Sequence, residues 1–371
     1  MKYYIIAGEA SGDLHGSNLV KELYRLDAQA AIRCWGGDKM EAAGATLVKH
    51  YRDLAFMGFV EVLMNLRTIF KNLKFCKEDI TAYRPDVLVL IDYPGFNLRI
   101  AKWAHEEGIK VIYYISPQVW AWKEGRVKMM KACIDKMLVI LPFEKEYYQR
   151  KWSWEVEYVG HPLTEVVAEV KKSENKNQRI SESPVIALLP GSRRQEIIKK
   201  LPVMLAVSRH YPTYQFVVAK APGLEESFYD ELLKAYPNVS YVSGRTYELL
   251  LQAEAALVTS GTATLETALF GVPEVVCYKG SSISYQIAKR VIRVKYISLV
   301  NLIMDRLVVK ELIQDELNES NLRKELDLLL HDEIRKEALK QDYAELWTKL
   351  GGHGNASANA ATAIYTFLKG E

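Results

Sequence analysis

The 371-residue sequence predicts an α/β protein with two doubly wound, Rossmann-like domains that face a cleft. Short apolar runs alternate with longer helical patterns along the chain, and this alternation is typical of βαβ units. Several of the runs, such as Val87–Ile91, are apolar at every position, as strands covered by helices on both faces are. A polar stretch without periodicity, Lys171–Arg179, interrupts the alternation, which then restarts.

These observations place a first domain at residues 1–165, a linker at 166–182 and a second domain at 183–350. The last segment, 351–371, contains a small-residue helix that we expect to dock back on the first domain or on the partner chain of a homodimer. In the first domain we expect strands at Tyr3–Ala7, Ile32–Gly36, Val87–Ile91, Val111–Ile115, Lys136–Ile140 and Val156–Val159, and helices at Gly16–Leu26, Val60–Tyr83, Leu98–Glu107, Gly125–Ala132 and Glu144–Lys151. In the second domain we expect strands at Val185–Leu189, Phe216–Ala219, Val239–Val242, Ala255–Val258 and Glu274–Tyr278, followed by a charged helical pattern over Asn321–Gly351. The small-residue helix of the last segment is expected at Ala356–Leu368.

The composition excludes several classes of protein. Forty-nine Lys and Arg residues against forty-six Asp and Glu leave a net charge of +3, which is too balanced for a protein whose main partner is nucleic acid. The four cysteines lie far apart without a C-x-x-C pair, which argues against a zinc site or a disulfide framework and suits a reducing cytoplasm. Because the sequence runs directly into a predicted strand, we expect no signal peptide. The longest uncharged apolar-rich stretch, Val111–Trp122, is too short for a membrane span. No D-x-D spacing occurs, so the usual metal-bridged diphosphate site has no ligands in its common form and we expect no metal. We expect no cofactor either.

Doubly wound sheets bind ligands in the loops that follow the carboxyl ends of their strands. Two such loops of the second domain suggest a nucleotide diphosphate site. After Val185–Leu189 come Gly191, Ser192 and Arg193, which offer a glycine turn, a hydroxyl and a fixed positive charge at a helix start. The alternative is a helix cap with exposed arginines.

The second loop follows the strand Ala255–Val258. Its small and hydroxyl residues leave room for a phosphate and offer backbone amides at a helix start; they are Ser260, Gly261, Thr262, Ala263 and Thr264. Glu266 lies one turn into the helix, where a carboxylate can accept both hydroxyls of a ribose or simply stabilise the helix dipole.

Three loops of the first domain carry further candidates. The loop after the first strand contains Ser11, Gly12 and Asp13, which fit either a ligand-binding helix start or a tight capped turn. Asp92 ends the buried strand Val87–Ile91 and is the candidate general base, the alternative being a turn former before Pro94. A further loop offers a wall for a sugar ring or an acyl chain, or an aromatic cap on the core, with Gln118, Trp120 and Trp122.

One segment is unusually apolar for a surface helix. Its apolar residues are Phe59, Val60, Val62, Leu63, Leu66, Ile69 and Phe70. Basic residues follow on the same segment, including Arg67, Lys71 and Lys74. A broad apolar face with a basic rim can rest on an anionic bilayer, and the alternative is a core helix with a solvated basic back.

Eight motifs, taken together and in order, closely resemble those of the lipid-A-disaccharide synthases. They span nearly the whole chain and are GEASGD at 8–13, MGFVEVL at 57–63, IDYPGFN at 91–97, SPQVWAW at 116–122, LPFEK at 141–145, GHP at 160–162, LLPGSR at 188–193 and SGTATLE at 260–266. The resemblance implies a GT-B glycosyltransferase fold and a place in lipopolysaccharide biosynthesis. It also implies a peripheral position on the cytoplasmic face of the inner membrane.

The resemblance further implies the reaction and the residues that perform it. UDP-2,3-diacylglucosamine and 2,3-diacylglucosamine 1-phosphate (lipid X) would give a β-1′,6-linked disaccharide and UDP. The essential aspartate of the family falls on Asp92, its diphosphate-binding arginine on Arg193 and its acidic residue on Glu266, while Asn301 matches a loop on the uracil and phosphate side. Gly95 stands where some members carry a second aspartate, so two carboxylates are not expected to share the role of base here.

An α-linked donor and a β-linked product require inversion, and hence a single displacement with a base on the acceptor. Two other interpretations share part of this pattern. An enzyme like UDP-N-acetylglucosamine 2-epimerase would use the same nucleotide loops without an acceptor site. A non-catalytic membrane protein that binds UDP-sugars would keep those loops without a need for Asp92.

Overall fold

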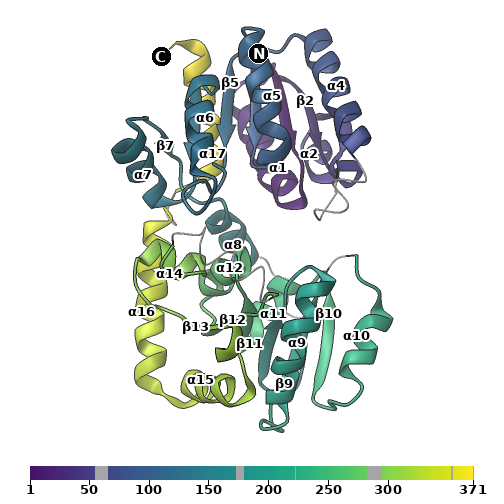
Figure 1. Cartoon of the computed structure of the whole chain (residues 1–371), viewed down its shortest axis with the longest axis vertical. Helices are drawn as coiled ribbons and strands as arrows, with labels where there is room; N and C mark the ends of the chain where they lie inside the picture. Colours follow the sequence, from purple (N-terminus) through teal and green to yellow (C-terminus); the bar gives the residue numbers. More distant parts are fainter. Residues whose placement is uncertain (55–65, 173–178, 222, 282–293, 352–353, 371) are drawn as a thin grey trace. The chain divides into compact units, whose positions relative to one another are not determined.

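A computed structural model describes residues 1–54, 66–172, 179–221, 223–281, 294–351 and 354–370. The chain divides into two compact units. Unit 1 comprises Met1–Pro162 together with Leu350–Glu371, and unit 2 comprises Leu163–Lys349. Each unit is a parallel β-sheet covered by helices, which confirms the predicted fold class (Figure 1).

The sheet of unit 1 has the strand order β3-β2-β1-β4-β5-β6-β7, with parallel pairing throughout. Strand β1 lies inside the sheet between β2 and β4, where Ile5 pairs with Cys34 on one side and with Val89 on the other. The strands are β1 (Lys2–Ala7), β2 (Ala31–Gly36), β3 (Thr46–His50), β4 (Val87–Ile91), β5 (Val111–Tyr114), β6 (Lys136–Val139) and β7 (Glu157–Tyr158). The helices are α1 (Ala10–Leu26), α2 (Asp38–Ala42), α4 (Leu66–Tyr83), α5 (Pro94–Glu106), α6 (Val127–Cys133), α7 (Pro142–Trp152) and α17 (Ala356–Lys369).

The core of unit 1 lies on both faces of this sheet, because successive residues of a strand point to opposite sides. In β4, Leu88 and Leu90 join one buried cluster, while Val87, Val89 and Ile91 join the other. The first cluster is completed by α4, α5 and α6, and the second by α1 and α17 (Figure 1). A strand that is apolar at every position therefore fits its place between two layers of helices.

The C-terminal helix α17 belongs to unit 1 although it follows unit 2 in sequence. Its small residues Ala360, Ala361 and Ala363 are buried in the same cluster as α1, and they allow the two helices to pack closely. Asn359 Nδ2 donates to the Val159 carbonyl at 3.0 Å and ties the helix to the end of the sheet.

The sheet of unit 2 has the order β10-β9-β8-β11-β12-β13, again with parallel pairing. Its strands are β8 (Val185–Leu189), β9 (Gln215–Lys220), β10 (Val239–Ser243), β11 (Ala253–Thr259), β12 (Glu274–Tyr278) and β13 (Lys310–Ile313). Its helices are α8 (Leu163–Lys172), α9 (Arg194–Ser208), α10 (Glu226–Leu233), α11 (Thr246–Gln252), α12 (Thr262–Phe270), α14 (Leu299–Met304), α15 (Glu319–His331) and α16 (Glu333–Lys349).

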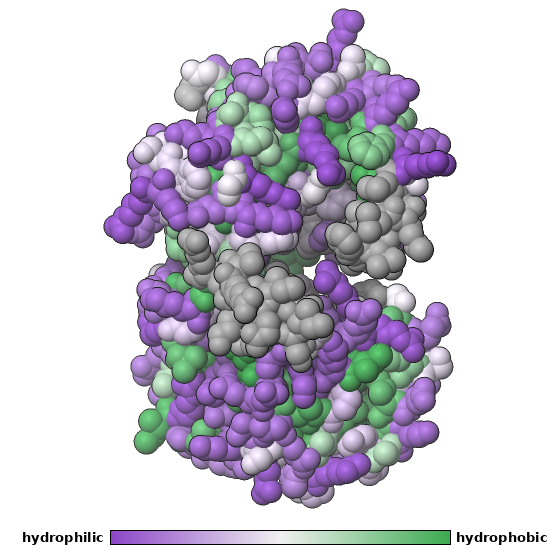
Figure 2. Space-filling view, viewed as in Figure 1, coloured by the Kyte–Doolittle hydropathy of each residue, from purple (hydrophilic) through white to green (hydrophobic). Residues whose placement is uncertain are grey.

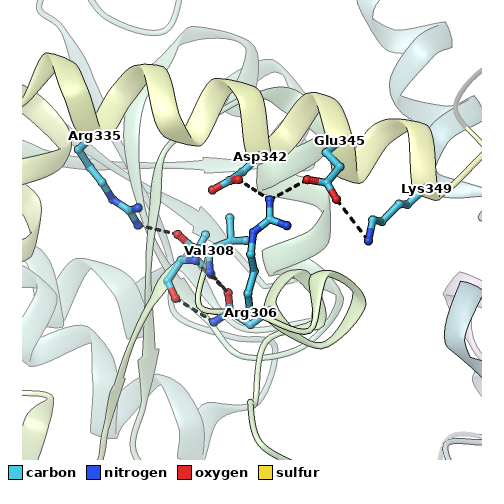
Figure 3. Close-up of polar contacts among 8 residues, drawn as sticks. Arg306, Val308, Arg335, Asp342, Glu345 and Lys349 are labelled. Carbon is cyan, nitrogen blue, oxygen red and sulfur yellow. Dashed lines mark hydrogen bonds and ion pairs between the residues drawn. The ribbon is translucent and has the colours of Figure 1, made fainter.

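A group of ion pairs fastens the segment after α14 to the long helix α16 (Figure 3). Arg306 Nη2 donates to Asp342 Oδ1 at 2.6 Å and to Glu345 Oε2 at 2.7 Å, and Lys349 lies 3.3 Å from Glu345. Arg335 Nη2 donates to the Val308 carbonyl at 2.5 Å. Because Arg306 is 44% exposed, we expect these pairs to contribute modestly to stability.

The structure corrects several sequence expectations. Residues 166–172 were expected in a linker but form the end of α8, because Val166 and Val167 are buried with the rest of unit 2. The charged helical pattern expected over Asn321–Gly351 is resolved into two helices, α15 and α16, which meet at Asp332. Strands β3 and β13 were not predicted, because each is short and carries charged residues.

Residues on the face shown in Figure 2 are mainly hydrophilic, and hydrophobic residues form scattered patches between them. No helix within the described residues is long and apolar enough to span a membrane. The four cysteines are free and buried.

Candidate functional site

Both sheets reverse their strand order at one point. In unit 1 the chain moves outward from β1 to β2 and β3, and later resumes on the other side of β1 with β4. In unit 2 the corresponding pair is β8 and β11. Ligands of open α/β sheets bind beyond the carboxyl ends of the strands at such switch points. The topology therefore directs attention to the loops after β1 and β4 in unit 1, and after β8 and β11 in unit 2.

The switch point of unit 2 carries a cavity of about 370 Å³. It is bounded by the ends of β8, β9 and β11 and by the starts of α9 and α12. Eight of the residues predicted to bind a nucleotide line it, namely Gly191, Ser192, Arg193, Ser260, Gly261, Thr262, Ala263 and Glu266. The remaining lining residues were not among those predicted to bind the nucleotide, and they are Leu189, Glu196, Ala219, Lys220, Ala221, Thr246 and Thr259.

Two glycines give this cavity its shape. Gly191 has φ +115° and Gly261 has φ +126°, a region of backbone conformation that side chains with a Cβ rarely adopt. Each glycine leads into a helix whose N-cap residue has no capping bond from its own side chain. Residues at the starts of α9 and α12 line the cavity, and no N-cap side chain occupies the first N–H groups of these helices. Uncapped N–H groups at a helix start bind phosphate well. Thr264 lies just behind them, and its hydroxyl donates to the Gly261 carbonyl at 2.8 Å.

Positive charge reaches the cavity from α9. The Arg193 side chain is 66% exposed, and its Nη1 lies 3.7 Å from Glu196 Oε1, too far for a hydrogen bond. Its guanidinium is thus held only loosely and can turn toward an anion. Glu196 Oε2 also lies 3.8 Å from the buried Lys200 Nζ, so this carboxylate stands between two cations.

Glu266 lies on the wall of the same cavity, within α12. Burial raises the pKa of its carboxyl, and the hydrogen bond from the Tyr247 hydroxyl, at 3.1 Å, acts in the opposite direction. A carboxylate held in this way can accept hydrogen bonds from a diol such as a ribose.

Asn301 lies outside the residues that line the cavity, contrary to its expected place on the uracil and phosphate side. Its side chain is fully buried and its hydrogen bonds are within the protein. Its Oδ1 accepts from the N–H groups of Val308 and Val309 at 2.8 and 2.9 Å, and its Nδ2 donates to Glu311 at 2.9 Å. The structure therefore gives Asn301 the role of holding the segment between α14 and β13.

In unit 1 the switch point is occupied by Asp92, directly after β4. Asp92 and Tyr93 have φ +44° and +47°, two successive residues in the left-handed region. Such a conformation costs free energy and persists only where the surroundings fix it. Here Asn97 Nδ2 donates to the Asp92 carbonyl at 2.9 Å, and the Tyr113 hydroxyl donates to the same oxygen. Paired strain of this kind is common at functional positions.

The surroundings of Asp92 also shift its protonation. Burial raises the pKa of Asp92 to about 7, with a further contribution from the negative charge of Glu9, while a backbone hydrogen bond from Tyr93 opposes both. Glu9 precedes α1 in the loop after β1. A carboxyl group with a pKa near neutrality is suited to act as a general base.

The residues of the loop after β1 mainly have structural roles around Asp92 and α2. A Cβ at Gly8 would lie 2.2 Å from the Tyr93 ring, so only glycine fits there. Asp13, expected in a ligand loop, is buried and caps α2, because its carboxylate accepts from the N–H groups of Gly37 and Met40 at 2.7 and 3.1 Å. Gly12 is buried against β1, and Ser11 is exposed.

The predicted wall lies after β5. Gln118 and Trp122 are exposed and Trp120 is half-buried. Trp120 Nε1 donates to Glu144 Oε1 at 3.2 Å, and its ring packs edge-on against Phe143. Glu144 was not singled out from the sequence. Burial raises its pKa to about 8, and no local pattern distinguishes such a buried carboxylate from an ordinary helix cap.

The apolar segment of the predicted membrane face is only partly described. Phe59, Val60, Val62 and Leu63 lie outside the described residues, and α4 begins at Leu66. Ile69 packs against the core of unit 1, contrary to its expected place on the patch. The Phe70 side chain is 64% exposed, and the neighbouring basic residues Arg67, Lys71 and Lys74 are exposed as well.

Two solved structures show the class of fold. The crystal structure of UDP-GlcNAc 2-epimerase from Neisseria meningitidis bound to UDP-GlcNAc matches with a TM-score of 0.68 at 14% identity, over 100% of both chains. The glycosyltransferase of kitacinnamycin matches with a TM-score of 0.63 at 15% identity, over 98% of both chains. The fold is thus the one shared by GT-B glycosyltransferases and UDP-GlcNAc 2-epimerases.

Sequence comparison separates these two activities. A family model described as lipid-A-disaccharide synthetase matches residues 3–364. A lipid-A-disaccharide synthase from Syntrophus aciditrophicus (strain SB) is 40% identical over 375 residues, covering 98% of this chain and 97% of the relative. The chain belongs to the lipid-A-disaccharide synthase family, as its motifs indicated, and is a glycosyltransferase. The epimerase alternative is not favoured.

Proposed function

We propose that the chain transfers 2,3-diacylglucosamine from its UDP conjugate to the 6-hydroxyl of lipid X. The observation that carries this proposal is the match of residues 3–364 to the family. The reaction of that family requires a nucleotide site and a base, and the cavity in unit 2 and the carboxyl group of Asp92 are suited to these roles. The oxygen of the 6-hydroxyl forms a bond to C1 of the donor sugar while the bond from C1 to the UDP oxygen breaks. The products are the β-1′,6-linked disaccharide 1-phosphate and UDP.

The cavity in unit 2 is the proposed site of UDP. The backbone amides at Gly191 and Ser192, the Arg193 guanidinium and the start of α12 at Ser260–Thr264 hold the diphosphate. Negative charge develops on this group as the bond to the sugar breaks, so donors placed in advance stabilise the transition state. Glu266 accepts the ribose hydroxyls. We assign the stabilisation of this charge to these donors rather than to a metal ion.

Asp92 is the proposed general base. The proton of the acceptor 6-hydroxyl moves to its carboxylate as the new bond forms, which makes the oxygen a stronger nucleophile. With a pKa of about 7, an appreciable fraction of Asp92 is ionised at neutral pH, and its basicity exceeds that of an ordinary aspartate. A single displacement assisted by one base gives inversion at C1.

The lipid character of both substrates gives roles to two further groups. We propose that Gln118, Trp120 and Trp122 form a wall for the acceptor sugar or its acyl chains. We also propose that α4 meets the cytoplasmic face of the inner membrane through Phe70, with Arg67, Lys71 and Lys74 near the anionic headgroups.

The proposal is tested by measuring UDP release from UDP-2,3-diacylglucosamine with and without lipid X, with mass spectrometry of the lipid product. Release that depends on lipid X and yields the disaccharide 1-phosphate is expected. Release at the same rate without lipid X contradicts the transferase assignment. Binding of the donor with neither release nor product points to a non-catalytic binding protein.

A further inference from the structure

A lysine side chain lies buried beside the cavity of unit 2, where the mechanism above gives it no role. Lys200 lies on α9, one turn after Glu196, and its side chain is only 4% exposed. Its Nζ donates a hydrogen bond to the hydroxyl oxygen of Thr259, the last residue of β11. Thr259 lines the cavity, whereas Lys200 does not. A buried ammonium group is costly, so its retention there calls for a function.

The chemistry of this pair fixes the direction of the bond. An ammonium group has donors and no acceptor, so the Thr259 Oγ1 must accept from Lys200. The hydroxyl hydrogen of Thr259 then points away from Lys200, and it has no acceptor among the described residues. Donation from a positive charge also polarises the hydroxyl and makes its own hydrogen a better donor.

The surroundings place Thr259 close to the phosphate-binding loop, with its methyl group toward the glycine turn. A Cβ built on Gly191 would lie 3.6 Å from the Thr259 methyl carbon, so Thr259 lies against the glycine turn after β8. The Lys200 Nζ lies 3.8 Å from Glu196 Oε2 and 6.0 Å from the centre of the Tyr278 ring. Neither contact competes for the oxygen of Thr259.

We propose that Lys200 is a positioning residue that acts through Thr259, fixing its hydroxyl as a hydrogen-bond donor to the diphosphate of the donor nucleotide. This inference rests on the proposed function, because it assigns a ligand to the same cavity. The diphosphate would then be bound by the exposed Arg193 and also by the neutral Thr259 hydroxyl, which the buried charge of Lys200 polarises. It also predicts that Lys200 and Thr259 act as one unit.

The test is the affinity of the full chain for UDP and for uridine, which lacks the diphosphate, in wild type, Lys200→Met, Thr259→Val and the double variant. Each single variant is expected to weaken UDP binding about tenfold, the effect of losing one hydrogen bond to a charged group. The double variant is expected to lose about the same tenfold, and uridine binding is expected to stay unchanged. Thr259→Ser, which keeps the hydroxyl, is expected to bind UDP as wild type does.

Lys199→Met is the matched control, because it removes an equal charge from the exposed neighbouring position of α9. It is expected to leave UDP affinity unchanged. Unchanged UDP binding in Lys200→Met, a hundredfold loss in the double variant, or an equal loss for uridine would each overturn the inference. If Lys200→Met does not fold, wild-type UDP affinity in Thr259→Val overturns it instead. Wild-type protein that binds no UDP would overturn the proposed function, and the inference with it.

Discussion

If Asp92 is the general base, as proposed, its surroundings set the pH dependence of catalysis. Burial and the negative charge of Glu9 raise its pKa from 3.8 to about 7. A general base acts in its ionised form, so kcat/KM should rise with pH and reach half of its plateau near pH 7. At pH 6 about one tenth of Asp92 is ionised, and kcat/KM should be about tenfold below the plateau. An aspartate with its ordinary pKa would be almost fully ionised at both pH values.

Substitution of Glu9 tests the cause of this shift. Glu9→Gln removes the negative charge that opposes ionisation of Asp92, so the midpoint of the profile should move to lower pH. Glu107→Gln is the control, because Glu107 is also exposed and lies at the far end of α5 from Asp92. The assay is initial-rate UDP release at limiting lipid X between pH 5 and 9. A wild-type midpoint near 4, or the same midpoint in Glu9→Gln, would refute the reasoning.

Three further predictions concern stability and the nucleotide cavity. Gly191→Ala should lower UDP affinity, measured by titration calorimetry, and should destabilise the chain by about 1–3 kcal/mol, measured by urea unfolding. The reason is that φ is +115° at this position and the new Cβ would lie 2.6 Å from Glu196 Oε2. Burial raises the pKa of Glu274 well above 4.5, so the folded state keeps a proton that the unfolded state loses, and stability should fall as pH rises above about 4.5. Glu274→Gln should remove this fall, which is at most ~1.4 kcal/mol per pH unit. The free energy of unfolding in urea is measured for both proteins at pH 5 and 8, and an equal change with pH in the two would show the idea to be wrong. Arg306→Ala should cost no more than about 1 kcal/mol and less in high salt, whereas a loss independent of salt would show that packing dominates.

Local sequence patterns could predict the loops of the cavity because each is defined by neighbouring residues. Gly191–Arg193 and Ser260–Thr264 follow apolar strands and precede helices, so their position at the edge of a parallel sheet follows from the pattern alone. That the two loops meet follows from the strand order, which places β8 beside β11.

Features that depend on contacts distant in sequence could not be predicted. Lys200 appears in the sequence as the second of two adjacent lysines, and only the structure shows that its side chain is buried against Thr259 of β11. Asn301 matches a family motif, but the N–H groups that occupy its side chain belong to residues 308 and 309. The capping of α2 by Asp13 likewise joins residues more than twenty positions apart.

The central claim is that unit 2 binds the donor nucleotide while Asp92 in unit 1 accepts the proton of the acceptor. Its most direct test is Asp92→Asn, measured for UDP affinity and for UDP release dependent on lipid X. The substitution keeps the size of the side chain and removes its basicity. Release should fall by at least about a hundredfold while UDP affinity stays at the wild-type value. Release at the wild-type rate would show that another group is the base, and a parallel loss of UDP affinity would show that Asp92 serves nucleotide binding instead.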